Sequence, residues 1–195
     1  MPSPAQRTES PRPTPVGIDF GTTTSLVAVL GRDGEVTVTP NRHGECSTPS
    51  VLFFGDQILV GADAAARASD ESGEYVEAYK RDIGLPHFHR QINDHGAPPE
   101  VLAGFTLAQL RHDAEQAIGR LGKAIITVPA YYDERRRHAT IAAGKLAGLD
   151  VADLINEPTA AALAHLYENR EAGATPVSFS LPDKRLLVYD LGGGT

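Results

Sequence analysis

Residues 125–164 read IITVPAYYDERRRHATIAAGKLAGLDVADLINEPTAAALA, and this stretch decides the fold. Its short apolar runs predict strands at residues 123–128 and 151–155, and its longer segments predict helices at 134–146 and 158–169. Strands that alternate with helices are typical of βαβ crossovers, which join parallel neighbours in one sheet. The stretch therefore predicts an α/β fold with a mixed or parallel sheet.

The residues around this stretch fit the same plan. Asp133 is suited to cap the first helix, and Gly148 lies where a glycine commonly ends one. Upstream, β-type runs on both sides of GTTT at 21–24 predict a β-hairpin. Further strands are predicted at residues 35–40, 50–55, 57–61 and 185–190, a short helix at 62–68, and a long helix from Pro98-Pro99 to about Gly119 with Val101, Leu102, Phe105, Leu110, Ala114 and Ile118 facing inward.

Composition excludes several classes of protein. The 18 Lys and Arg residues against 25 Asp and Glu give a net charge of −7 with no basic block, which argues against nucleic acid and anionic lipid as partners. No apolar run approaches the ~18 residues of a membrane span, and the N-terminus has no secretory apolar region. A single cysteine, Cys46, allows no intrachain disulfide. We therefore expect a cytoplasmic protein.

The two ends of the chain differ in character. Residues 1–15 contain five prolines among polar residues, which predicts a disordered arm, and residues 171–184 are expected to form an exposed loop. The last residues, LLVYDLGGGT, are an apolar run that leads into a glycine turn. We therefore expect residues 16–195 to be the first part of a larger domain.

Two segments share an arrangement that suits a magnesium nucleotide. In IDFGTTT (18–24) and YDLGGGT (189–195), an apolar run delivers an aspartate, and glycine and threonine follow. Glycines allow backbone N–H groups to approach phosphate oxygens, and an aspartate at a strand end can hold a water of Mg²⁺. A single such segment could equally be a hairpin turn, but two copies favour a phosphate site. Neither a P-loop motif nor a dinucleotide fingerprint is present.

The VPAYY…R…AT…AAG…AG…INEPTAAALA string resembles the heat-shock protein 70 family of DnaK-type chaperones. YKRDIG at 79–84, and NRHG at 41–44 leading to TPS at 48–50, fit the same family. The resemblance covers residues 16–195. It implies an actin-like ATPase (ribonuclease H-like) fold, of which this chain holds only the first lobe, a mixed sheet flanked by helices. It also implies that the complete domain hydrolyses ATP to ADP and phosphate and is coupled to peptide binding.

The resemblance also implies roles for individual residues. Lys80 would point at the γ-phosphate and orient the attacking water, and Pro129 and Arg137 would pass the nucleotide state onward. Asp19, Asp190 and Glu157 would hold waters of Mg²⁺, and Glu157 would also sense the nucleotide. The first phosphate loop would be Gly21, Thr22 and Thr23; the second would be Gly192, Gly193, Gly194 and Thr195, with Thr195 beside the γ-phosphate.

Each of these residues also has a simpler interpretation. Lys80 beside Arg81 could be a solvated basic pair, and Glu157-Pro158 could simply begin a helix. Pro129 could only end a strand, and Arg135 to Arg137 could be a solvated helix face, which we expect for Arg135 and Arg136. His87 and His89 could bind a metal, but we expect them to lie in a loop. Cys46 has no base nearby in sequence and is not expected to be a nucleophile.

The chain departs from the family in two single residues and in two larger respects. Phe20 and Thr24 stand where leucine and asparagine are usual, and the short stretch between Lys80 and Pro129 predicts a reduced peripheral subdomain. We expect the second lobe and the peptide-binding domain, through which unfolded clients would bind, to lie outside this chain. J-domain co-chaperones and nucleotide-exchange factors remain possible partners. We therefore expect this chain alone to bind nucleotide weakly or not at all, without turnover.

Two other functions are compatible with the motifs. An actin-like filament ATPase would share the phosphate loops and the glutamate-proline-alanine string, although Lys80 and the VPAYYDERRRHAT segment argue against it. A non-catalytic module that senses nucleotide would bind without turnover even in a complete domain.

Overall fold

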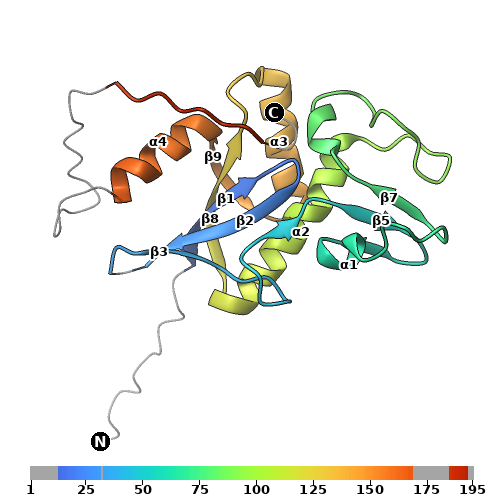
Figure 1. Ribbon diagram of the computed structural model, residues 1–195, viewed down its shortest axis with the longest axis horizontal. Helices are drawn as coiled ribbons and strands as arrows, with labels where there is room; N and C mark the ends of the chain where they lie inside the picture. The colour runs from blue at the N-terminus through green and yellow to red at the C-terminus, as the bar shows by residue number, and fades with distance from the viewer. Residues whose placement is uncertain (1–12, 32, 169–184, 193–195) are drawn as a thin grey trace, which may run out of the picture.

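The computed structural model describes residues 13–31, 33–168 and 185–192 (Figure 1). Its main sheet has the strand order β3-β2-β1-β8-β9, with β4 paired to β2. β1 and β2 form the predicted antiparallel hairpin, whereas β8 and β9 run parallel to β1. The predicted mixed sheet is therefore confirmed. Its strands are β1 (Thr14–Phe20), β2 (Thr24–Leu30), β3 (Val36–Val38), β4 (Thr48–Pro49), β8 (Leu121–Val128) and β9 (Asp150–Asn156).

The alternation of side chains along β1 and β8 gives this sheet two different faces. In β1, Val16, Ile18 and Phe20 are buried, while Gly17 and Asp19 point to the other side. In β8, Ala124, Ile126 and Val128 are fully buried, while Ile125 and Thr127 share the opposite face with Gly17 and Asp19. One face is therefore packed, and the other is partly exposed and carries both polar and apolar residues.

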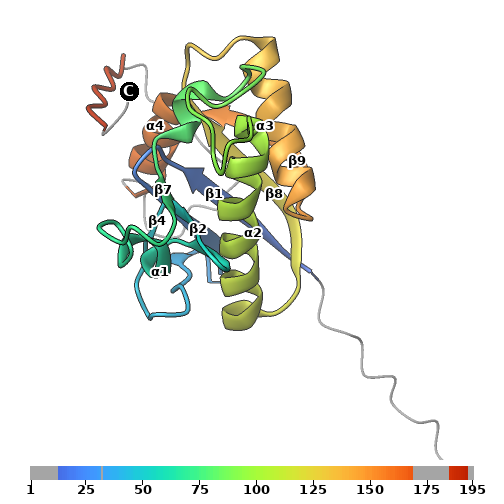
Figure 2. The ribbon, with the colours of Figure 1, turned by 90° about the vertical axis from the view of Figure 1, so that its right-hand side faces the viewer.

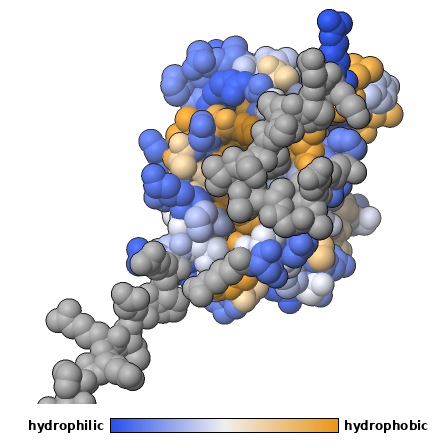
Figure 3. Space-filling model, turned by 90° about the vertical axis from the view of Figure 1, so that its left-hand side faces the viewer, coloured by the Kyte–Doolittle hydropathy of each residue, from blue (hydrophilic) through white to orange (hydrophobic). Residues whose placement is uncertain are grey.

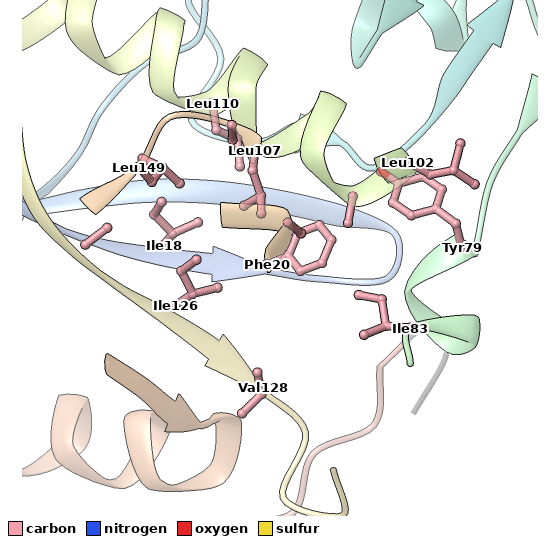
Figure 4. Close-up of a cluster of buried hydrophobic side chains, with 14 of the residues drawn as sticks. Ile18, Phe20, Tyr79, Ile83, Leu102, Leu107, Leu110, Ile126, Val128 and Leu149 are labelled. Carbon is pink, nitrogen blue, oxygen red and sulfur yellow. The ribbon is translucent and has the colours of Figure 1, made fainter. Parts of the chain in front are cut away.

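Two helices cover the packed face (Figure 2). They are α2 (Pro99–Ile118) and α3 (Glu134–Leu146), and they also contact each other. Leu102, Leu107 and Leu110 of α2 lie against Ile18 of β1 and Ile126 of β8 in the core (Figure 4). Asp133 caps α3 by accepting a hydrogen bond from the Arg136 N–H, and Gly148 follows that helix with a φ of 76°, both as predicted.

A second, smaller sheet lies beside α2, and its strands are all antiparallel. It contains β6 (Ile58–Val60), β5 (Leu52–Phe54) and β7 (Glu74–Val76) in that order, with the short helix α1 (Ala62–Ala65) against it. A single 3₁₀ turn, η1 (Tyr79–Asp82), follows β7 and leads the chain back toward the main sheet. The polypeptide then runs without regular structure until α2 begins at Pro99.

The last described helix lies on the opposite side of the main sheet from α2 and α3. This helix, α4 (Glu157–Glu168), follows β9 directly, and residues 185–192 extend beside it (Figure 1). The predicted strand at 185–190 is wrong, because these residues form no ladder with any described strand and Leu187 is 94% exposed. An extended segment without a hydrogen-bonding neighbour is not a strand.

Three other expectations meet the structure differently. Val101 is not inward but 37% exposed, because the packed stripe of α2 runs through Leu102, Leu107 and Leu110 instead. Thr14 and Pro15, placed in the predicted arm, belong to β1, and residues 1–12 and 171–184 lie outside the described part of the chain. Within the described ranges, no helix is both long and apolar enough to cross a membrane.

Candidate functional site

A cleft of about 660 Å³ opens on the face of the main sheet that α2 and α3 leave uncovered. Figure 3 views the molecule from this side and shows apolar side chains among hydrophilic ones. Most of the sequence-predicted site residues that the structure describes line this one cleft. They are Asp19, Gly21, Thr22, Thr23, Lys80, Glu157, Asp190 and Gly192, together with Gly17, Thr127 and small side chains of α4.

The loop between β1 and β2 is a tight turn that only glycine permits at position 21. A Cβ atom on Gly21 would lie 2.1 Å from the carbonyl oxygen of Thr24. The Gly21 N–H donates to the Ser25 hydroxyl over 3.1 Å, and the Ser50 hydroxyl donates to the Gly21 carbonyl over 2.9 Å. The two serine oxygens are 2.8 Å apart and both residues are buried. The Gly21 peptide is therefore fixed on both sides.

This arrangement changes which groups of the loop can bind a phosphate. Because the Gly21 N–H is already used by Ser25, it is not available to a ligand in this conformation. The N–H groups of Thr22 and Thr23 have no hydrogen-bond partner among the described residues, and both threonines line the cleft. Among the described residues, the backbone donors of this loop without a partner are therefore those of Thr22 and Thr23, and Gly21 shapes the turn.

Lys80 belongs to the turn η1 and is 3% exposed, although most lysines are solvated. Its ammonium Nζ is 2.5 Å from the Glu157 carboxylate Oε1 and also donates to the Phe20 carbonyl. The same ammonium lies 5.5 Å from the centre of the Phe20 ring. The interpretation of Lys80 and Arg81 as a solvated pair is therefore wrong for Lys80, whereas Arg81 is exposed.

Two buried tyrosines hold the turn that carries Lys80. The Tyr132 hydroxyl donates to the Lys80 carbonyl over 2.8 Å, and the Tyr79 hydroxyl is 2.5 Å from the Thr106 hydroxyl of α2. Burial raises the pKa of both phenols, so both stay protonated at neutral pH. Lys80 is thus fixed at its backbone as well as at its ammonium.

A second set of contacts connects Glu157 to the segment after β8. Asn156 and Glu157 stand at the junction of β9 and α4, and Asn156 Oδ1 accepts a hydrogen bond of 2.5 Å from the Arg137 guanidinium. Arg137 also donates to the Tyr132 carbonyl, and the Tyr132 N–H donates to the Pro129 carbonyl. Glu157 does begin a helix, as the simpler interpretation held, but it also pairs with Lys80, which that interpretation did not include.

Asp19 reaches the cleft from the last part of β1. Its carboxylate Oδ1 accepts a hydrogen bond of 2.7 Å from the Thr127 hydroxyl on the neighbouring strand β8. That hydroxyl in turn accepts the Phe20 N–H over 3.1 Å. Asp190 and Gly192 of the second segment also line the cleft, whereas Gly193, Gly194 and Thr195 lie outside the described residues.

The remaining candidates lie outside the cleft. His89 pairs with Asp82 over 2.7 Å in the loop between η1 and α2, and no group of three potential metal ligands occurs within residues 13–31, 33–168 and 185–192. Cys46 is a free, exposed thiol. Arg135 is exposed as expected, whereas Arg136 is half-buried, with its guanidinium 5.6 Å from the ring centre of Tyr132.

Sequence reasoning missed four residues of the site: Thr127, Ser25, Ser50 and Tyr132. Their hydroxyls make hydrogen bonds to the turn at Gly21, to Asp19 or to the turn that carries Lys80. Thr127 could have been found, since it is the hydroxyl residue within the apolar run at 124–128, and that strand runs parallel to the one that carries Asp19. Ser50 could not, because only the folded chain brings it to Gly21.

The donor set of the cleft fits a magnesium nucleotide. Mg²⁺ prefers oxygen ligands and is usually bound through one or two carboxylates, water and substrate phosphates, so two or three separated carboxylates suffice. Asp19, Glu157 and Asp190 supply such oxygens around one cleft, and Lys80 with the Thr22 and Thr23 N–H groups can face phosphate oxygens. Gly17 adds open space, because a Cβ there would meet nothing within 4 Å.

The fold is an α/β fold with a mixed sheet flanked by helices, in agreement with the actin-like ATPase fold expected from the sequence. Residues 15–195 match the family model described as Hsp70 protein, and the chain therefore belongs to the Hsp70 family. It is 43% identical over 183 residues to the chaperone protein DnaK of Thermotoga petrophila and of Thermotoga maritima. The DnaK of Thermosipho melanesiensis is 39% identical. Each match covers 92% of this chain but only 29% of the relative.

Proposed function

We propose that this chain is the first lobe of an ATP-binding and ATP-hydrolysing chaperone domain that couples nucleotide state to the binding of unfolded peptides. The observation that carries the proposal is the environment of Lys80. Lys80 is 3% exposed, pairs with Glu157 and contacts the end of β1 next to Asp19. For packing alone, an apolar residue would serve better at this position. A binding role for the charge of Lys80 explains the arrangement.

The ion pair between Lys80 and Glu157 suits a site that exchanges partners when a ligand arrives. Without ligand, Glu157 balances the buried ammonium at 2.5 Å. A γ-phosphate in the cleft would offer Lys80 a stronger anionic partner, and would release Glu157 to contact the hydrated metal. Asn156 and Arg137 adjoin Glu157, so this exchange would reach Tyr132 and the segment at Pro129. This is the route by which Pro129 and Arg137 would report the nucleotide state.

Hydrolysis of the phosphoanhydride bond between the β- and γ-phosphates of ATP requires positioning and charge more than covalent chemistry. Bound Mg²⁺ would neutralise the phosphate oxygens that develop charge. Thr22 and Thr23 would hold phosphate oxygens through their N–H groups, Lys80 would place charge near the transferred group and orient the attacking water, and Asp19 and Asp190 would hold metal-bound water. We extend the proposal to Gly192, Gly193, Gly194 and Thr195 as the second phosphate loop, with Thr195 beside the γ-phosphate.

The chain spans less than a third of the length of the DnaK relatives it matches. We therefore infer that residues beyond these 195 supply the adenosine pocket and the peptide site, and that the chain alone binds nucleotide weakly without turnover. Every ~1.4 kcal/mol of lost contact weakens binding about tenfold. Unfolded clients, a J-domain co-chaperone, a nucleotide-exchange factor and a cytoplasmic location belong to the same proposal.

The proposal is tested by Lys80→Met in a longer chain that includes the second lobe, with Arg81→Met as the matched control. We expect Lys80→Met to abolish ATP turnover while ADP still binds, and Arg81→Met to leave turnover unchanged, because Arg81 does not line the cleft. Unchanged turnover in Lys80→Met would contradict the proposal. Saturable nucleotide binding without turnover in the unaltered longer chain would favour a nucleotide-sensing module, and ATP-driven polymerisation would favour a filament protein.

A further inference from the structure

Thr127 is a residue of the cleft to which neither the motifs nor the family resemblance gave a role. It lies on β8, which runs parallel to β1. In the register of these two strands Ile126 pairs with Ile18, so Thr127 follows Ile126 as Asp19 follows Ile18. Because successive side chains alternate, Asp19 and Thr127 both project to the cleft face while Ile18 and Ile126 are buried. The register therefore places the hydroxyl of Thr127 beside the carboxylate of Asp19.

The hydrogen bonds of this hydroxyl leave it a single orientation. A hydroxyl has one hydrogen to donate, and here it also accepts the Phe20 N–H over 3.1 Å. Its own hydrogen is thus directed to Asp19 Oδ1, 2.7 Å away. The Phe20 N–H belongs to a fully buried residue, which fixes the donor in place. Among the described residues, no other hydrogen bond reaches the Asp19 carboxylate, so Thr127 alone sets its direction.

We propose that Thr127 is a positioning residue that orients the Asp19 carboxylate toward the hydrated metal of a bound nucleotide. This inference rests on the proposed function and deepens it. The bond occupies Oδ1, and Oδ2 of this cleft-lining residue keeps no hydrogen-bond partner among the described residues, so it remains available as an acceptor. An exposed aspartate without such a bond would sample several rotamers, and it would have to be ordered each time that a ligand binds.

Two substitutions separate the hydroxyl from the shape of the side chain. Thr127→Val keeps the β-branched form and removes the hydrogen bond, whereas Thr127→Ser keeps the hydroxyl and removes a methyl group. Both side chains are compatible with a strand, and thermal unfolding of each variant would show that it is folded. If Thr127 positions Asp19, the valine variant loses the fixed orientation of the Asp19 carboxylate. The serine variant keeps that orientation, because it keeps the hydroxyl.

Two measurements are made on the isotopically labelled 195-residue chain. The first is the χ1 rotamer order of Asp19 from three-bond couplings, which needs no ligand. The second is the affinity for ADP with Mg²⁺ and with EDTA, from chemical-shift titrations. We expect the unaltered chain and Thr127→Ser to show one Asp19 rotamer and tighter binding with Mg²⁺. In Thr127→Val, Asp19 should become averaged and the benefit of Mg²⁺ should fall about tenfold, with the affinity in EDTA unchanged.

The outcomes distinguish this inference from the proposed function. A single Asp19 rotamer in Thr127→Val, or an undiminished benefit of Mg²⁺, would overturn the positioning role. An equal loss of affinity with Mg²⁺ and with EDTA would also overturn it, since that result would indicate general damage to the cleft. If the unaltered chain gains no affinity from Mg²⁺, the proposed function of this chain fails. The rotamer measurement then still decides whether Thr127 orients Asp19.

Discussion

The two faces of the main sheet use the same strands for opposite purposes. On one face, Ile18 and Ile126 lie under α2 and α3 with almost no exposure. On the other, Asp19 and Thr127, the next residue of each strand, face the cleft and bond to each other. Consecutive residues of β1 therefore have different surroundings: Ile18 lies in the core and Asp19 lines the cleft. The packing of one face therefore fixes where the residues of the other face lie.

The largest effect should come from a pair of adjacent isoleucines on opposite faces of β8. Ile126 is fully buried and Ile125 is 45% exposed. Ile126→Ala should lower the free energy of unfolding by ~2–5 kcal/mol, because it removes buried methyl groups and leaves a cavity. Ile125→Ala should lower the free energy of unfolding by about 1 kcal/mol or less, because the Ile125 side chain buries less apolar surface on folding than that of Ile126. Urea denaturation of both variants would measure the difference, and equal losses would remove the contrast between the faces.

A pair of helix glycines tests how closely the packed face is filled. A Cβ on Gly144 of α3 would lie 2.5 Å from Val151 Cγ2, whereas a Cβ on Gly104 of α2 would have its nearest neighbour at 3.4 Å. We expect Gly144→Ala to destabilise the chain by ~1–3 kcal/mol through overpacking. Gly104→Ala should be neutral or stabilise by up to ~1 kcal/mol, because alanine favours helix. Stabilisation by Gly144→Ala in thermal melts would show that α3 can move away from the sheet.

A smaller effect is expected where the packed region fixes the cleft. Tyr132→Phe removes the hydroxyl that donates to the Lys80 carbonyl and should cost ~0.5–1.5 kcal/mol. The neighbour Tyr131 is 59% exposed, so Tyr131→Phe should change stability by less than ~0.5 kcal/mol. Urea denaturation compares the two variants. If both lose equal stability, the bond to Lys80 is not what fixes the turn.

The smallest effect lies far from both faces. Hydrogen bonds from Ser72, with a further one from Arg67, lower the pKa of Asp70 from its ordinary 3.8 to about 2. A carboxylate with a lowered pKa stabilises the folded chain above pH 3.8, and this contribution is lost as the pH falls toward 2. Asp70→Asn should therefore slightly flatten the acid side of the stability–pH curve. Glu71→Gln, at the exposed neighbour, is the control, and an identical curve for Asp70→Asn and the unaltered chain would contradict the prediction.

Regular periodicity made much of this fold predictable. The hairpin at GTTT, the helix at 134–146 with its Asp133 cap, and the parallel strands around it are all present, because their signals are local. The strand predicted at 185–190 is absent, since a strand needs a partner that local sequence does not supply. Arg136 was expected in solvent, but the folded chain brings two tyrosine rings to it.

The sequence motifs predicted which residues line the cleft, but not how those residues contact each other. The resemblance placed Lys80, Glu157, Asp19 and Asp190 together, and the structure does bring them to one cleft. It did not indicate that Lys80 and Glu157 pair directly, or that Gly21 is held between two serines. The contacts of Lys80 with Glu157 and of Gly21 with Ser50 join residues far apart in the chain, and therefore depend on the folded arrangement rather than on any motif.

The central claim is that the cleft face of the main sheet binds a magnesium nucleotide. The most direct test is to titrate ADP with Mg²⁺ into the labelled 195-residue chain and to map the amide shifts. We predict weak but saturable shifts, with a Kd on the order of 1 mM, confined to Asp19, Thr22, Thr23, Thr127 and the start of α4. Shifts on α2 and α3 instead, or none at about 10 mM ADP, would contradict the claim.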